Sequence, residues 1–208
     1  MQIQVAVSDL SYKWAGCKRC FWAKYREGWR EPKGIFPGVF HTLDKIQREY
    51  WQGKLAAEVC PTLPRIVLQA QKQKIKSQPI QFGPVAIVLS GEMDVYGTDG
   101  RQTVILDNKV TGKLDQEKVD IYSQTLRAYA YCKAYPEEGD PWPPARHLGL
   151  VGLIPRKLNA RGILEVEQIF LPIHPDGFLP FMAEVARLLA GPKPPAKEKC
   201  GWCSLRER

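Results

Sequence analysis

The sequence lacks any apolar run approaching the roughly 20 residues that a membrane-spanning helix needs. Residues 1–14 contain Asp9 and lack a basic-then-apolar leader, so we expect no secretory signal and a cytoplasmic protein. No internal repeat is present, and 208 residues is a length typical of one domain. We therefore expect a single domain over residues 1–208 that has no role at a membrane.

Acidic residues are comparatively few, because 22 Asp and Glu stand against 30 Lys and Arg, for a formal net charge of +8. Such an excess favours an anionic partner such as nucleic acid, although a basic surface without any partner would carry the same charge. In residues 1–40 the basic side chains are interleaved with Trp22, Tyr25 and Trp29. Cations beside aromatic rings bind single-stranded nucleic acid through phosphates and stacked bases, and an amphipathic helix can show the same mixture.

The order of apolar patterns predicts an α/β fold, with helices flanking one mixed β-sheet. Residues 9–30 are expected to be helical or turn-like, and the polar, basic stretch 69–81 is expected to be a loop or an exposed extension. Helices are predicted at 38–52, 114–135 and 178–189. Strands are predicted at 85–89, 93–96, 103–106, 148–154 and 163–173, with a turn at 159–162 and a stiff linker at 191–196.

The predicted helix 38–52 carries an apolar stripe at helical spacing, formed by Val39, Leu43, Ile46 and Tyr50. His41 lies off this stripe, on the opposite side of the helix, so the local pattern alone favours a solvated histidine. The other histidines, His147 and His174, are expected to be structural or surface residues.

Residues 91–112 are the most informative segment, because two acids and a lysine lie near predicted strand ends. A turn signal between the acids predicts a hairpin, with Asp94 on one arm and Asp107 at the end of the other. Side chains two apart share one face of a strand, so Asp107 and Lys109 are expected to lie together. Asn108 points the other way, but its backbone carbonyl stays near the site.

This arrangement of charges suits phosphodiester hydrolysis. Two carboxylates on adjacent strands can share a hard cation such as Mg²⁺ or Mn²⁺. A neighbouring ammonium can hold the attacking water or stabilise the negative charge that develops on the phosphate. The alternative is a surface salt bridge between Asp107 and Lys109, since an acid two residues before a lysine is common near strand ends.

Two C-x-x-C pairs, Cys17/Cys20 and Cys200/Cys203, lie in segments 9–30 and 192–208, outside the expected core of about 36–190. Each pair lets two thiolates bind one metal atom or cluster, and two pairs make a four-thiolate site. Thiols stay reduced in a cytoplasmic protein, so metal ligation explains the pairs better than disulfides do. Four thiolates suit Zn²⁺ as well as an iron–sulfur cluster. Cys60 and Cys132 are expected to be buried thiols.

In the order and spacing of these motifs, the chain resembles the RecB-like nucleases of the PD-(D/E)XK superfamily over about residues 8–203. Gly91-Glu92-Met93-Asp94 is similar to the family's G-x-x-D, and Leu106-Asp107-Asn108-Lys109-Val110-Thr111 is similar to its D-x-K-T. Gly38-Val39-Phe40-His41 looks like the family's histidine motif on an upstream helix. Gln124 and Tyr129 resemble its Q-h-x-x-Y motif, with one residue more between them than usual.

The resemblance implies a restriction-endonuclease-like core and a metal-dependent DNA exonuclease acting on single-stranded or end-bearing DNA. It implies that Mg²⁺ or Mn²⁺ is bound by His41, Asp94, Asp107 and the Asn108 carbonyl. Lys109 would orient or activate water, Gln124 would position the site or contact the DNA backbone, and the role of Tyr129 stays open. The alternatives are a non-catalytic DNA-binding or partner subunit with the same fold, and an interaction protein held together by its metal.

A subset of RecB-like nucleases, which includes AddB-type subunits and CRISPR-associated Cas exonucleases, holds a [4Fe–4S] cluster on one cysteine before the core and three after it. Cys17 resembles the first of these, and Cys200 and Cys203 resemble the first two of the trailing three. A third trailing cysteine is absent, so either Cys20 replaces it or the chain stops short of it. The resemblance favours the cluster over Zn²⁺, and it implies a possible protein partner in CRISPR adaptation, repair or phage DNA processing.

Overall fold

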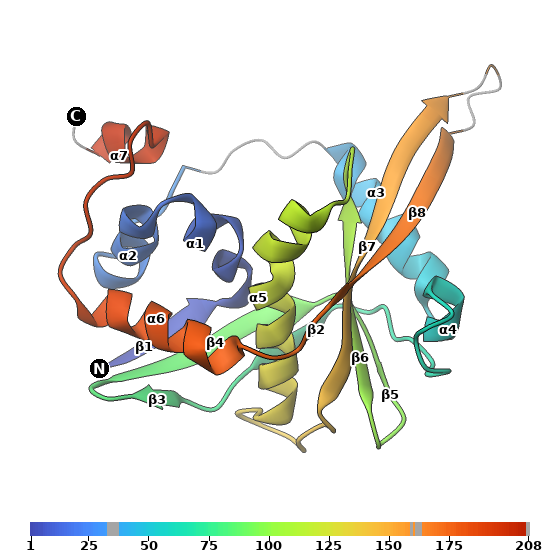
Figure 1. Ribbon diagram of the computed structural model, residues 1–208, viewed down its shortest axis with the longest axis horizontal. Helices are drawn as coiled ribbons and strands as arrows, with labels where there is room; N and C mark the ends of the chain where they lie inside the picture. The colour runs from blue at the N-terminus through green and yellow to red at the C-terminus, as the bar shows by residue number, and fades with distance from the viewer. Residues whose placement is uncertain (33–37, 159, 161–163, 207–208) are drawn as a thin grey trace.

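The computed structural model describes residues 1–32, 38–158, 160 and 164–206, which form a mixed α/β fold with helices flanking two β-sheets (Figure 1). The helices are η1 (Val7–Leu10), α1 (Tyr12–Gly16), α2 (Lys18–Arg26), α3 (Gly38–Trp51), α4 (Ala56–Val59), α5 (Gln116–Ala134), α6 (Phe178–Ala190) and α7 (Gly201–Arg206). The predicted turn at 159–162 lies outside the described residues apart from Ala160. No helix in the described ranges is long and apolar enough to cross a membrane.

The first sheet is built around β4 (Val85–Met93), which pairs in parallel with β1 (Gln2–Ala6) and antiparallel with β2 (Gln73–Lys76) and β3 (Ile80–Phe82). The prediction of a loop at 69–81 is therefore wrong. β2 and β3 each bury a single isoleucine and expose polar side chains, so they carry too weak an apolar signal to be read as strands. β1 alternates exposed and buried residues, a period-two signal that the sequence interpretation missed.

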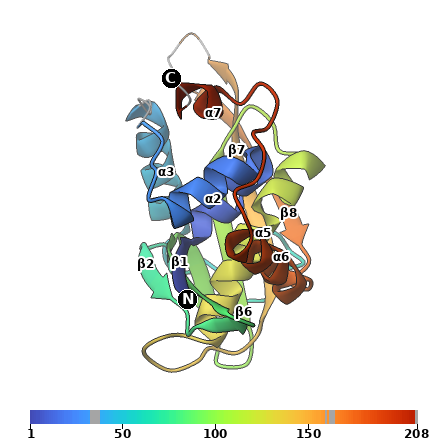
Figure 2. The same cartoon turned by 90° about the vertical axis from the view of Figure 1, so that its left-hand side faces the viewer.

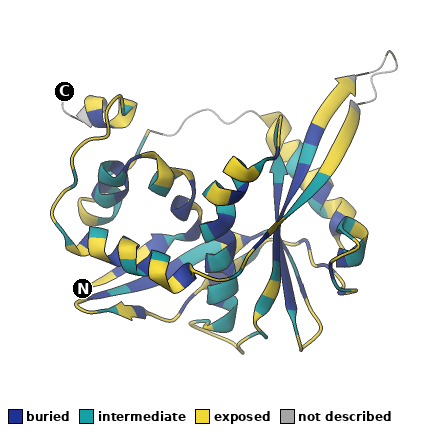
Figure 3. Cartoon of the chain, in the orientation of Figure 1, coloured by how far each residue is buried: buried dark blue, intermediate teal, exposed yellow. Residues whose placement is uncertain are grey.

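The second sheet has the order β5–β6–β7–β8, where β5 is Val95–Thr98, β6 is Thr103–Val110, β7 is Ala145–Leu158 and β8 is Leu164–Ile173. β5 and β6 form the predicted antiparallel hairpin, and β6 runs parallel to β7. The expectation of one sheet is thus corrected to two mixed sheets. The far ends of β7 and β8 project from the body of the protein and are exposed (Figures 1 and 3).

Asp94 lies at the point where the chain leaves the first sheet and enters the second. β4 ends at Met93 and β5 begins at Val95, so residues 91–93 of the predicted hairpin arm belong to the first sheet. In the second sheet Val95 pairs with Leu106, which sets Asp94 beside Asp107 at the open end of the hairpin. The two acids are thus placed by backbone pairing.

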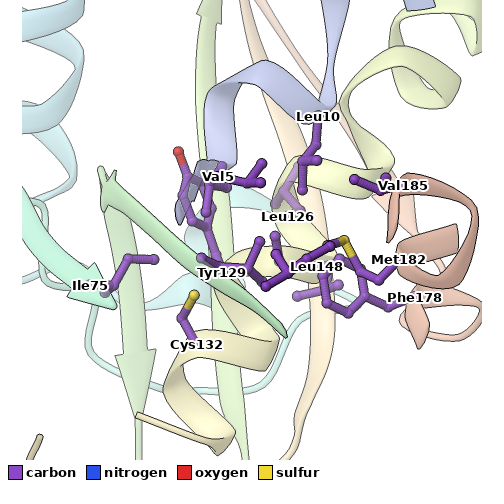
Figure 4. Close-up of a cluster of buried hydrophobic side chains, with 14 of the residues drawn as sticks. Val5, Leu10, Ile75, Leu126, Tyr129, Cys132, Leu148, Phe178, Met182 and Val185 are labelled. Carbon is purple, nitrogen blue, oxygen red and sulfur yellow. The ribbon is translucent and has the colours of Figure 1, made fainter. Parts of the chain in front are cut away.

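Helix α5 forms the centre of the main core and contacts strands of both sheets. Its N-cap Asp115 accepts a hydrogen bond from the backbone nitrogen of Lys118, which starts the helix. Buried Leu126 and Tyr129 on this helix belong to the same core cluster as Leu148 of β7 and Met182 of α6 (Figure 4). This packing determines which face of α5 contacts the strands.

Helix α3 is confirmed, but it does not bury its apolar stripe. Val39, Ile46 and Tyr50 are 59%, 53% and 56% exposed, whereas Gln47 and Trp51 are 4% and 2% exposed. The helix packs against β6, and Trp51 belongs to a second core cluster with Val104 and Leu106. The burial of this one large side chain outweighs the stripe and turns the polar face of α3 toward the second sheet.

The C-terminal helix α7 returns to contact α2, although the two termini themselves lie apart (Figure 2). The linker after α6 is held along α2, because Trp22 Nε1 donates to the Gly191 carbonyl at 3.2 Å. Lys193 Nζ adds an ion pair with Glu27 at 2.9 Å. These contacts bring the segment 192–206 over residues 12–26.

Candidate functional site

Four cysteines gather where α7 contacts α2. Cys17 ends α1 and caps α2, Cys20 lies in the first turn of α2, and Cys200 and Cys203 flank the start of α7. The sulfur of Cys203 lies 3.6 Å from those of Cys17 and Cys20, and the sulfurs of Cys20 and Cys200 are 3.7 Å apart. All four sulfur atoms lie within 4.8 Å of one another, so the predicted pairs form one group that could bind a metal.

The spacing of the sulfurs bears on the kind of metal. Around one tetrahedral ion with metal–sulfur bonds of about 2.3 Å, neighbouring sulfurs lie about 3.8 Å apart, which is close to the distances between these cysteines. A [4Fe–4S] cluster binds each thiolate to a different iron, so the sulfurs would have to move apart to hold it. The donor set itself fits either species.

The electrostatics of the group favour one thiolate at Cys17. Burial acts to raise the pKa of Cys17, but backbone N–H groups of Cys20 and Lys197 and the neighbouring thiols lower it to about 6. Burial and then the neighbouring sulfurs raise the pKa of Cys20, whereas burial, Cys17 and Cys200 raise the pKa of Cys203 against an opposing effect of Cys20. A lowered pKa at one sulfur beside raised pKa values at its neighbours means that the thiols share protons, which a bound metal would replace.

The predicted acidic site lies at the junction of the two sheets. Asp107 is 3% exposed, and Lys109 Nζ lies 2.7 Å from its Oδ2 atom. Apart from this ion pair, Oδ2 is buried without a hydrogen-bond partner among the described residues. Such an oxygen remains able to accept a cation, so Asp107 fits the predicted role of a metal ligand.

Asp94 is half-buried, and the charge of the neighbouring Asp107 acts on its carboxyl group. Burial, then the charges of Asp107 and Asp44, raise the pKa of Asp94 to about 6, while Lys109 and Lys72 oppose the rise. Two carboxylates that disfavour each other's charge in a partly buried site are stabilised by a divalent cation between them.

His41 is not gathered with the acids. It is exposed on α3, and among the described residues only the four cysteines form a group of three or more side-chain ligand atoms within 4.8 Å. It does lie three and seven residues before Asp44 and Arg48, which places it on their face of the helix. Asp44 and Arg48 form an ion pair at 3.1 Å.

Of the two residues matched to the family's helix motif, Tyr129 faces the acids and Gln124 does not. Tyr129 is 7% exposed, and its pKa is raised by burial and then by the charges of Asp107 and Asp94. Five residues of helix place Gln124 about 140° around the axis from Tyr129. The Gln124 Oε1 atom is buried without a hydrogen-bond partner in the described part of the chain, on the opposite side of α5.

Asn108 alternates to the other face of β6, as predicted. Its side chain is 6% exposed, and neither its amide nitrogen nor its oxygen has a hydrogen-bond partner among the described residues. The same is true of the buried side-chain amide of Gln47 on α3, the helix that packs against this strand. Gln47 is a buried polar residue beneath α3 that the sequence interpretation did not single out.

Tyr122 is a second residue at the site that sequence reasoning missed. Lys109 Nζ lies 4.4 Å from the centroid of its ring. Tyr122 precedes Tyr129 by two helical turns, so the two residues share one face of α5. Once Tyr129 had been matched to a motif, this two-turn spacing would have identified Tyr122 as a residue on the same face of the helix.

No protein-family model and no curated protein matches this sequence. A search of solved structures finds one titled "Crystal structure of SSO0001", with a TM-score of 0.52 and 10% sequence identity. The match covers 98% of this chain and 84% of that chain. At this identity the similarity concerns the fold, and it extends over nearly the whole described chain.

Proposed function

We propose that the protein is a Mg²⁺- or Mn²⁺-dependent deoxyribonuclease with a RecB-like, restriction-endonuclease-like core. Its substrate would be single-stranded or end-bearing DNA. The observation that carries the proposal is the convergence of Asp94, Asp107 and Lys109 at the junction of the two sheets. Two acids with one adjacent ammonium are the side chains that phosphodiester hydrolysis requires.

Asp94 and Asp107 would hold the divalent ion with the Asn108 carbonyl, and His41, which is not gathered with the acids, would have to approach them to complete the ligands. When bound, such an ion would lower the pKa of a coordinated water and neutralise charge on the scissile phosphate. The Lys109 ammonium, now paired with Asp107, would turn toward the phosphate and stabilise the charge developing there. Tyr129 would close the floor of the site beneath the carboxylates.

The charge of the chain supports a nucleic-acid substrate. Beyond the net charge of +8, Lys72 and Lys109 are close enough to the acids to lower the pKa of Asp94. Cations beside a carboxylate pair would attract the DNA backbone to the position where the acids hold the metal. Gln124 faces away from the acids, so we assign it no direct role in hydrolysis.

The cysteine group would serve the nuclease as a structural clasp. It would hold the N-terminal helices and the segment after the linker together, beside the acidic site. The family resemblance supports a [4Fe–4S] cluster, and the sulfur spacing supports a single ion such as Zn²⁺. A visible absorbance spectrum of anaerobically purified protein distinguishes the two, because only iron gives a broad thiolate charge-transfer band.

Degradation of labelled single-stranded DNA with Mn²⁺ tests the proposed activity. The native protein should degrade the substrate, and Lys109→Ala should lower the rate by about 10²–10³-fold, the usual cost of removing one charge-stabilising group. Lys76→Ala is the matched control, because Lys76 lies on β2 outside the site, where it forms an ion pair with Glu137. Equal rates for the native protein and Lys109→Ala would refute the assignment.

One observation favours a second candidate, a non-catalytic DNA-binding subunit with the same fold. His41 does not join Asp94 and Asp107 as a compact set of ligands. This candidate predicts salt-sensitive DNA binding without metal-dependent cleavage, so the DNA should stay intact with or without Mn²⁺. The degradation experiment therefore separates the two candidates.

A further inference from the structure

The lysine of the acidic site lies against an aromatic ring. Lys109 Nζ is 4.4 Å from the centroid of the Tyr122 ring, in addition to its 2.7 Å contact with Asp107. An ammonium over a ring face is attracted by the ring's quadrupole, most strongly where water is partly excluded. Because a lysine side chain is long and has many rotamers, the ring restricts where this ammonium can lie.

The Tyr122 ring is in turn held by Tyr12 of α1. The two rings meet edge to face, with centroids 5.3 Å apart and an interplanar angle of 88°. Tyr12 Oη also accepts a hydrogen bond from Lys118 Nζ at 2.7 Å. Tyr12 is 46% exposed, so these contacts and the position of α1 hold it in place more than burial does.

Helix α1 belongs to the wall of the cysteine group. It spans only Tyr12–Gly16, and Cys17 follows directly as its C-cap, with its N–H bonded to the Lys13 carbonyl at 3.3 Å. Tyr12, Cys17 and Cys200 line one cavity. A single short helix therefore separates a metal-binding sulfur from the ring that supports Tyr122.

We propose that Tyr122 is a positioning residue for Lys109, and that the cysteine centre orients it through α1 and Tyr12. Ligation of Cys17 would hold α1, the edge-to-face contact with Tyr12 would hold the Tyr122 ring, and the face of that ring would hold the ammonium beside Asp107. The effect on rate rests on the proposed nuclease function, whereas the effect on geometry does not. The centre would thereby influence hydrolysis without touching DNA.

NMR of lysines dimethylated with ¹³C-formaldehyde tests the contact between Lys109 and Tyr122. The Lys109 signal, assigned by its loss in Lys109→Arg, should be displaced by the ring current in the native protein and in Tyr122→Phe. Tyr122→Leu should abolish the displacement. Tyr131→Leu is the matched control, because Tyr131 is also half-buried on α5 but packs against Phe178 and Tyr135. A Lys109 signal that stays displaced in Tyr122→Leu overturns the proposal.

The same signal tests the coupling to the cysteine centre. Tyr12→Leu should broaden the Lys109 signal and reduce its displacement while leaving the metal content unchanged. The metal-free Cys200→Ser variant should do the same, and if this variant fails to fold, Tyr12→Leu decides the question alone. An unchanged Lys109 signal in folded Tyr12→Leu would rule out the coupling.

Cleavage kinetics show whether the position of the lysine matters for the reaction. Tyr122→Leu should lower kcat about tenfold with KM within about twofold, and the conservative Tyr122→Phe should restore kcat. Native kcat in Tyr122→Leu overturns the positioning role while the nuclease function stands. Absence of cleavage in the native protein contradicts the nuclease function instead, and the NMR displacement then decides the geometric part.

Discussion

The cysteine group and the acidic site are assembled over very different distances along the chain. Cys17 and Cys203 are 186 residues apart in sequence, yet their sulfurs lie 3.6 Å from each other. Asp94 and Asp107 flank a single hairpin, and backbone pairing alone brings them together. Closing a long loop costs more chain entropy than closing a hairpin, so the remote group has more need of a strong bond to hold it.

This difference suggests a division of roles. Asp107 stands on a paired strand and Asp94 at the junction of two strands, so backbone pairing sets their positions, which suits side chains that have to be held precisely for chemistry. The cysteines lie on short helices near the ends of the chain, where a bound metal would contribute directly to folding. Substitutions at the acids should therefore affect activity more than stability, and substitutions at the cysteines should affect stability more than activity.

The largest effect is expected from Asp107→Asn. Loss of this carboxylate should lower the rate of DNA cleavage by about 10³-fold or more, because a metal ligand and the partner of Lys109 are removed together. The melting temperature and the metal content of the cysteine group should stay close to native values. Asp99→Asn, in the exposed turn of the same hairpin, is the matched control. A strong loss of stability in Asp107→Asn would contradict the division of roles.

Replacement of both trailing cysteines, Cys200→Ser with Cys203→Ser, should affect stability and metal content more than the rate of DNA cleavage. The protein should lose its bound metal, and its free energy of unfolding should fall by several kcal/mol, because metal binding contributes to folding. Elemental analysis and chemical denaturation measure the two effects. Cys60→Ser is the control, since Cys60 lies outside the group. Native stability and native metal content in the double variant would show that the cysteine group is not a structural clasp.

A third prediction compares the buried face of α3, which holds this helix against the second sheet, with its exposed apolar stripe. Trp51→Ala should destabilise the protein by about 3–5 kcal/mol, because it empties a fully buried site. Ile46→Ala, on the exposed stripe of the same helix, should change stability by less than about 1 kcal/mol. Denaturant titrations of both variants measure the difference. A larger loss for Ile46→Ala would mean that the stripe is the packed face.

The smallest effect is the pH dependence contributed by Asp94. Its pKa in the folded protein is raised to about 6, above the ordinary value of 3.8, so the folded state binds more protons than the unfolded state in that range. Stability without divalent metal should therefore fall as pH rises from about 4 to 6, by roughly 1–3 kcal/mol. Asp94→Asn should flatten this part of the profile, and added Mn²⁺ should oppose the fall. An unchanged profile in Asp94→Asn would assign the slope to other groups.

The elements with strong local signals were predictable from the sequence. The hairpin between Asp94 and Asp107 has a turn signal between alternating strands, and the two C-x-x-C pairs are conspicuous because the ligand spacing is itself local. Helices α5 and α6 follow from long apolar periodicity. Edge strands such as β2 and β3 were missed, because pairing with β4 supplies most of what holds them.

What the sequence did not reveal depends on partners far along the chain. The buried face of α3 is decided by the space that β6 and its neighbours leave for Trp51, which the helix's own pattern does not encode. The division into two sheets depends on a single residue, Asp94, at which β4 ends and β5 begins. The place of Tyr122 beside Lys109 requires knowing which face of α5 meets the strands.

The distance along the chain between the two cysteine pairs has a consequence for biosynthesis. Cys20 and Cys200 are 180 residues apart, so at about 5–20 residues per second the second pair is synthesised roughly 10–40 s after the first. During that interval two thiols wait on the nascent chain without their partners. If the group binds a metal, acquisition would therefore be a late step, and a cell short of metal or exposed to oxidants at that moment would accumulate chains whose two cysteine pairs never meet.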